Sequence, residues 1–174
     1  MSKKEYRTVV VGTDGSPLAA TTVARAAWLA AHEDADLVIV CAYAESTRRA
    51  EAKNVATIAG DTRLAQVVLG RDAASQALGA AVAGAGEAGA TIAAALLVEG
   101  EPAAALLEVA EQRNAGLIVL GAIADRTIVD RLLGTVAEEV AKSARCDVLI
   151  VRPAAPAAVA APSADAAEPA THAG

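Results

Sequence analysis

The chain has 174 residues, a net charge of −6, 55% hydrophobic residues and only 2% aromatic residues. This length suits one domain, whose core must be built from Ala, Val, Leu and Ile. The acidic balance and the lack of any Lys/Arg-rich run exclude the electrostatic footprint of a nucleic-acid-binding protein. No apolar run reaches the roughly 18 residues of a membrane-spanning helix, and the start does not resemble a signal peptide, so we expect a cytoplasmic protein.

Strands and helices are predicted to alternate from the start of the chain. The β-branched run 8–11 predicts a strand, and the Ser-Pro pair at 16–17 predicts the cap and first residue of a helix that ends near residue 31. A continuously apolar strand follows at 37–43. We expect Trp28 to serve packing. We expect four residues of the first helix to face the sheet: Ala20, Val23, Ala27 and Ala30.

The second half continues this alternation. Segment 45–69 has no sustained period and is interpreted as an irregular excursion over the ligand-binding face. Segment 153–174 consists almost entirely of Ala, Pro and small polar residues, so we predict a disordered tail after a single domain at 1–152. The remaining predicted elements are helices at 71–89, 102–113 and 136–144, and strands at 91–98, 117–120 and 148–151.

Alternating strands and helices predict an α/β fold with a single doubly wound, five-stranded parallel sheet and four helices. Ligands of such Rossmann-like sheets bind at the carboxyl ends of the strands, where the strand order reverses. Two loops, 12–16 and 121–135, are therefore candidates for a binding site. Asp14 could accept hydrogen bonds from ribose hydroxyls, or it could cap its own turn. Gly134 and Thr135 could bind an anion at a helix start, or they could form a connection without a ligand.

The second loop resembles the universal stress protein family, whose nucleotide-binding members carry the motif G-x2-G-x9-G-[S/T]. Gly121, Gly134 and Thr135 stand at this spacing, whereas Ala124 replaces the second glycine. The resemblance covers about residues 6–152 and implies the strand order 3-2-1-4-5.

Residues 146–151 resemble the last strand of that family, in which proline is common where this chain has Asp147. The resemblance implies a homodimer in which two such strands pair antiparallel across a two-fold axis. The alternative is an edge that the tail or Arg152 protects. The implied interface residues are Val148, Leu149, Ile150 and Val151.

The resemblance also implies a site for an adenine nucleotide. The Gly-Thr-Asp-Gly-Ser opening and the Ala-Tyr pair that ends the second strand look like those of a subgroup that binds cyclic AMP as well as ATP. Either ligand is therefore expected, and ATP could bring Mg²⁺. The residues implied are Thr13 and Asp14 at the ribose, the Ala42 backbone at the adenine edge, Gly121 beside the ribose, and Gly134, Thr135 and the Val136 N–H at the phosphate.

We expect a sensor or buffer of an adenine nucleotide in a stress response, and not an enzyme. No Ser-His-Asp arrangement, Walker lysine motif or cluster of metal-binding carboxylates stands out, and His32 and His172 lie away from both candidate loops. The methyl group of Ala124 would crowd a backbone that should approach phosphate oxygens. The alternative function is therefore a family member that binds no nucleotide and acts as a dimeric protein-interaction module.

Overall fold

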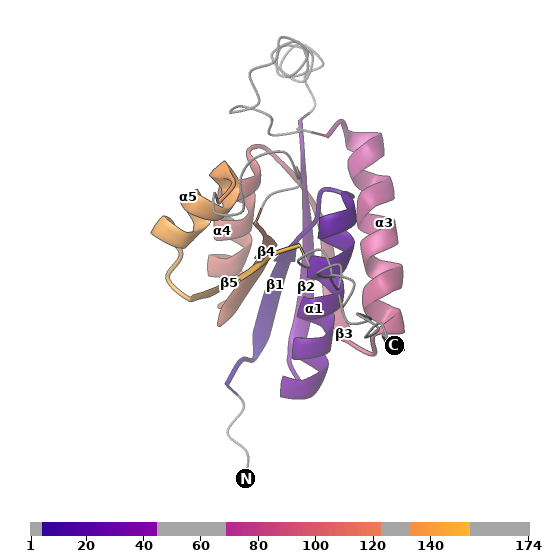
Figure 1. Ribbon diagram of the computed structural model, residues 1–174, viewed down its shortest axis with the longest axis vertical. Helices are drawn as coiled ribbons and strands as arrows, with labels where there is room; N and C mark the ends of the chain where they lie inside the picture. The colour runs from indigo at the N-terminus through magenta and orange to yellow at the C-terminus, as the bar shows by residue number, and fades with distance from the viewer. Residues whose placement is uncertain (1–4, 45–68, 123–132, 154–174) are drawn as a thin grey trace, which may run out of the picture.

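The computed structural model describes residues 5–44, 69–122 and 133–153. Five strands form one parallel sheet in the order β3-β2-β1-β4-β5, with helices packed on both of its faces (Figure 1). The predicted α/β class, doubly wound arrangement and strand order are confirmed. The elements are β1 (Thr8–Gly12), α1 (Pro17–Glu33), β2 (Asp36–Tyr43), α3 (Arg71–Glu87), β3 (Thr91–Glu99), α4 (Pro102–Gln112), β4 (Leu117–Gly121), α5 (Thr135–Ser143) and β5 (Asp147–Val151).

Two of the sequence predictions fall largely outside the described residues. These are the irregular excursion at 45–69, of which only Leu69 is described, and the tail at 153–174, of which only Pro153 is described. Within the described ranges, no helix is long and apolar enough to cross a membrane.

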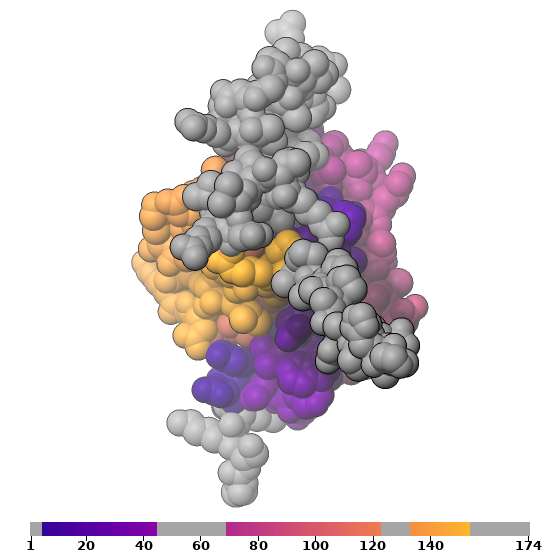
Figure 2. Space-filling view, in the orientation of Figure 1, coloured from indigo at the N-terminus to yellow at the C-terminus, as the bar shows by residue number. Residues whose placement is uncertain are grey.

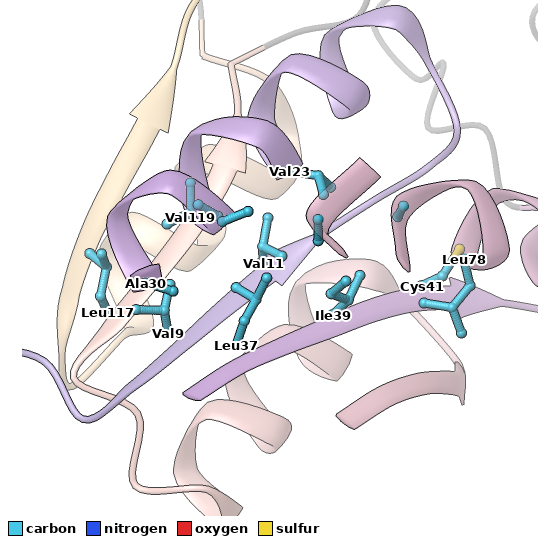
Figure 3. Close-up of a cluster of buried hydrophobic side chains, with 14 of the residues drawn as sticks. Val9, Val11, Val23, Ala30, Leu37, Ile39, Cys41, Leu78, Leu117 and Val119 are labelled. Atoms are coloured by element: carbon cyan, nitrogen blue, oxygen red, sulfur yellow. The ribbon is translucent and has the colours of Figure 1, made fainter. Parts of the chain in front are cut away.

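The sheet separates two apolar layers, because successive residues of a strand point to opposite faces. On one face, Val9 and Val11 of β1 pack with side chains of α1 and α3, including Val23 and Leu78 (Figure 3). On the other face, Val10 packs with residues of α4 and α5. Both layers contain many alanines, whose small side chains bring the helices close to the sheet.

The strand β1 lies at the centre of the sheet and sets the position of the candidate loops. It pairs in parallel with β2 on one side and with β4 on the other, so that Val11 is in register with both Ile39 and Val119. Parallel strands end at the same edge of a sheet. The loops that leave β1, β2 and β4 therefore all start from one edge, the carboxyl edge.

The helix α1 begins as the sequence predicts. The Ser16 hydroxyl oxygen accepts a hydrogen bond from the Ala19 N–H at 3.1 Å, and Pro17 occupies the first helical position. The predicted inner face needs a correction at Ala20, which is exposed, whereas Ala19 is buried. An alanine-rich helix has apolar residues on every side, so its pattern leaves the facing direction poorly defined.

The predicted packing role of Trp28 is wrong. Its side chain is 51% exposed, and its ring lies 4.1 Å from that of His32, centroid to centroid. Trp28 follows the buried residues Ala26 and Ala27 and points away from the sheet.

In the surface view, α5 and β5 form one side of the molecule and α3 forms the opposite side (Figure 2).

Candidate functional site

The loop that leaves β1 is held by short hydrogen bonds. The Thr13 N–H donates to the Val40 carbonyl oxygen at 2.9 Å and fastens the loop to β2. Asp14 Oδ1 accepts from the Ser16 N–H at 2.9 Å, which is the turn-capping role that the sequence left open. A carboxylate offers about four acceptor positions, so this turn leaves capacity for a ligand's hydroxyl groups. Asp14 is exposed.

Glycine is required at position 15. Gly15 has φ +75°, a left-handed conformation that residues with a Cβ rarely adopt. A Cβ at this position would also lie 3.0 Å from the Cβ of Ala77 in α3. The Asp14 loop is therefore packed against α3 as well as fastened to β2.

The charge of Asp14 also reaches the end of β2. Burial raises the pKa of the Cys41 thiol to about 11, and the nearby Asp14 carboxylate contributes to this shift. The Thr13 N–H, next to Asp14, is bonded to Val40, which lies two residues before Ala42. The structure therefore brings the predicted ribose residue and the predicted adenine residue to the same corner of the carboxyl edge.

The backbone of Ala42 points toward the space beyond the end of β1. The carbonyl of Val40 faces β1, because it accepts from Thr13, whereas the carbonyl of Tyr43 faces the other way and accepts from Gly100 at 2.9 Å. Backbone groups alternate in direction along a strand, so the N–H and C=O of Ala42 face the same side as those of Val40. Backbone recognition of an adenine edge needs this orientation.

Residues after β2 border this corner. Leu69 forms an isolated parallel bridge with Tyr43 and accepts a hydrogen bond from the Ala44 N–H at 3.0 Å. The guanidinium carbon of Arg71, at the start of α3, lies 5.7 Å from the centroid of the Tyr43 ring, within cation–π range. Arg71 is not among the residues predicted from the sequence, because its position over Tyr43 depends on how α3 packs against the sheet.

The loop that leaves β4 ends at α5. The Ala122 N–H donates to the Val151 carbonyl at 2.8 Å, and the Gly134 N–H donates to the Ala122 carbonyl at 2.8 Å. The start of α5 therefore lies directly beside the end of β4. Residues 123–132, which include Ala124, lie outside the described part of the chain.

The first turn of α5 offers backbone N–H groups to an anion. Gly134 is the N-cap residue and has no side chain with which to bond these N–H groups, and Thr135 and Val136 follow it. Uncapped N–H groups at a helix start carry partial positive charge. Gly134 has φ −65°, which any residue can adopt, so the backbone conformation does not by itself require glycine at this position.

An ion pair offsets the negative charge near this turn. Glu138 lies in the first turn of α5, and the Lys142 ammonium contacts its Oε1 at 2.5 Å. This hydrogen bond and the positive charge lower the pKa of Glu138. Among the described residues, no group of three or more His, Cys, Asp or Glu side chains could hold a metal ion.

The structure thus places the predicted residues in three groups on one edge. Thr13, Asp14 and Ala42 meet at the end of β1 and β2. Gly121 is the last residue of β4 and lies against α1. A Cβ at position 121 would crowd the side chain of Leu18 in that helix. Gly134, Thr135 and Val136 start α5 beside β4, and together the three groups could hold a base, a sugar and an anion.

Comparison with known proteins gives one consistent result. The model of the universal stress protein family matches residues 5–152. Universal stress protein Rv1636 of Mycobacterium tuberculosis strain H37Rv is 39% identical over 151 residues, which make up 84% of this chain and 96% of that protein.

Two solved structures extend this similarity. A universal stress protein in complex with cAMP is 36% identical, with a TM-score of 0.61 over 84% of this chain and 97% of its own. The universal stress protein of Archaeoglobus fulgidus in complex with dAMP is 23% identical, with a TM-score of 0.58 over 83% of this chain and 97% of its own, and it shares the fold.

Proposed function

Because the chain belongs to the universal stress protein family, we propose that it binds an adenine nucleotide at the carboxyl edge of its sheet and acts as a sensor or buffer of that nucleotide in a stress response. The observation that carries this proposal is the corner formed by Asp14 and Ala42. An exposed carboxylate, fixed by its turn, lies there beside backbone groups that point past the end of β1.

Each part of an adenine nucleotide has a counterpart at this edge. The ribose hydroxyls would donate to the carboxylate of Asp14, with Thr13 beside them, and the adenine edge would bind the backbone of Ala42. The phosphate would accept hydrogen bonds from the first turn of α5, at Gly134, Thr135 and Val136. We also propose binding without turnover, since the sequence contains no evident Ser-His-Asp arrangement, Walker lysine motif or cluster of metal-binding carboxylates.

Cyclic AMP is the ligand that we propose to test first. A relative with 36% identity was solved in complex with cAMP. A cyclic monophosphate carries a single negative charge and needs fewer phosphate contacts than ATP, so it depends less on the loop in which Ala124 replaces a glycine. If ATP binds instead, Mg²⁺ would accompany it on its phosphates.

We further propose a homodimer that pairs two β5 strands across a two-fold axis. The strand β5 is an edge of the sheet and contains Val148, Leu149, Ile150 and Val151. Leu149 is 37% exposed although it is apolar. Pairing would satisfy the open backbone groups of this edge. The same dimer would support the alternative function, a protein-interaction module that binds no nucleotide.

Two variants of Asp14 test the site. Asp14→Asn keeps an oxygen that can accept from the Ser16 N–H but loses the charge, whereas Asp14→Ala loses both. We expect cAMP affinity to fall in both variants, and the fall should be larger for Asp14→Ala. Circular dichroism should show folded protein in each case. Unchanged affinity in Asp14→Ala would refute the assignment of the ribose contact.

A further inference from the structure

The central strand β1 and its neighbour β4 each end on a glycine, and helices crowd these two glycines from opposite faces of the sheet. A Cβ at Gly12, the last residue of β1, would lie 3.2 Å from Leu106 Cδ1 in α4. A Cβ at Gly121, the last residue of β4, would lie 3.1 Å from Leu18 Cδ2 and 3.2 Å from Thr22 Oγ1 in α1. Neither glycine has a positive φ. Their requirement for glycine is therefore a matter of space and not of backbone conformation.

The wall that faces Gly121 is rigid on one side. Thr22 is fully buried, and its hydroxyl donates to the Leu18 carbonyl at 2.7 Å. Rotation of this hydroxyl away from Gly121 would leave a buried polar group without its hydrogen bond, which is costly. A methyl group at position 121 must therefore displace Leu18 or the first turn of α1.

Displacement of the first turn of α1 would change the position of Asp14. Leu18 is the second residue of α1, and the helix is capped by Ser16, whose N–H also donates to Asp14 Oδ1. The cap, the turn and the start of the helix thus form one hydrogen-bonded unit. A shift of the Leu18 backbone by a few tenths of an ångström would therefore move the Asp14 carboxylate relative to the end of β4.

We propose that Gly121 serves the nucleotide site by packing, and that Leu18 is a positioning residue that fixes the Asp14 loop against the end of β4. This inference rests on the proposed function. It adds to the role that the family resemblance implies, in which the Gly121 backbone adjoins the ribose. Leu18 and Thr22 of α1 fill the direction in which a Cβ at position 121 would point, and the ligand depends on this contact through the position of Asp14.

The test compares the wild type with Gly121→Ala, Leu18→Ala and the double variant. Gly121→Ala should weaken cAMP binding about tenfold, at a temperature at which circular dichroism shows full folding, because overpacking displaces the loop. Leu18→Ala alone should also weaken binding, because the Asp14 loop loses its contact with the end of β4. It makes room for the methyl group that Gly121→Ala adds, so the double variant should bind about as tightly as Leu18→Ala and more tightly than Gly121→Ala. A double variant that binds as weakly as Gly121→Ala would show that the loss of affinity is not transmitted through Leu18, and it would overturn the proposal.

Gly12→Ala is the matched control. It adds the same methyl group to the neighbouring strand, but it presses on Leu106 of α4. Any loss of cAMP affinity in Gly12→Ala should therefore not be restored by adding Leu18→Ala. If Leu18→Ala restored the affinity of both glycine variants, it would act by loosening the protein in general, and the proposal would be overturned. Lower stability alone would shift the unfolding midpoint, but it would leave the affinity of the folded protein unchanged.

Urea unfolding of the same four proteins separates this inference from the proposed function. If none of the four proteins binds cAMP, the proposed function fails. The stability data then test whether Gly121 packs against Leu18. If the stability losses caused by Gly121→Ala and Leu18→Ala are not additive, the two residues are coupled, and the proposed packing contact between them stands. Additive losses would overturn it.

Discussion

The Tyr6 hydroxyl donates a hydrogen bond to Asp147 Oδ2 at 2.9 Å, and this bond joins the start of the domain to the first residue of β5. In the universal stress protein family, proline is common where this chain has Asp147. Proline has no carboxylate, so this chain gains a contact between residues 141 positions apart. The contact lies at the amino edge of the sheet, opposite the candidate site.

Tyr6→Phe should therefore lower stability without affecting ligand binding. At neutral pH we expect a loss of about 0.5–1 kcal/mol in the free energy of unfolding, because the bond is partly exposed. The Asp147 carboxylate raises the pKa of Tyr6 above its usual value of 10.0. The contribution is thus present below pH 10 and is lost as the pH rises through the folded-state pKa. Urea unfolding at pH 7 and pH 11 measures this difference, and an equal loss at both values would contradict it.

Cys41 should make the protein less stable at alkaline pH. Its pKa is raised from 9.0 to about 11 in the folded state, so only the unfolded chain loses this proton between these values. The free energy of unfolding should therefore decrease from pH 9 to pH 11. Cys41→Ala should flatten this slope, although Cys146 and Tyr6, whose pKa values are also raised, leave part of it. An unchanged slope would contradict the assignment.

The thiol of Cys41 should also be unreactive in the native protein. It is fully buried and mostly protonated at neutral pH, whereas Cys146 is partly exposed. Iodoacetamide at pH 7.5 should label Cys146 first and Cys41 only after denaturation, as peptide mass mapping can show. Native labelling of Cys41 at the rate of Cys146 would mean that the end of β2 is open.

Glycines in α3 offer a way to stabilise the protein. A Cβ at Gly79 or Gly84 would meet nothing within 4 Å, and both lie inside the helix. Gly79→Ala and Gly84→Ala should each raise the free energy of unfolding by about 0.5–1 kcal/mol. Gly15→Ala is the contrasting variant and should destabilise, because Gly15 has φ +75° and a Cβ at this position would lie 3.0 Å from the Cβ of Ala77. Chemical denaturation ranks the three.

Among the described residues, the exposed large apolar side chains are Trp28 and Leu149, and the proposed dimer predicts a response at Leu149 only. Light scattering should give twice the chain mass, and Leu149→Glu should give a monomer, because it places like charges in the paired edge. Trp28→Glu is the matched control. Trp28 is more exposed than Leu149 but lies on the outer side of α1, so its substitution should leave the mass unchanged. A monomeric wild type would refute the dimer.

The fold could be predicted because its signals are local. Runs such as 37–43 are continuously apolar, and Ser16 with Pro17 marks a helix start without reference to other segments. The strand order came from the family resemblance. The failures at Ala20 and Trp28 have a common cause. Alanine on every side of α1 gives no strong periodicity, so tertiary packing decides which residues face the sheet.

The candidate site could be predicted only in part. The positions of Asp14 and Gly134 follow from the rule that loops at the carboxyl edge bind ligands. The contact of Gly121 with Leu18 and the position of Arg71 over Tyr43 were not foreseen. They depend on distances between segments far apart in the sequence, which no local pattern records.

Calorimetric titration of the nucleotide-stripped wild type with cAMP, and separately with ATP, tests the central claim most directly. We expect saturable binding in the micromolar range to a site that contains Asp14, with cAMP bound at least as tightly as ATP. The complete absence of heat from both ligands at millimolar concentration, on protein shown to be folded, would contradict the claim. The chain would then be a member of the family that works through protein contacts alone.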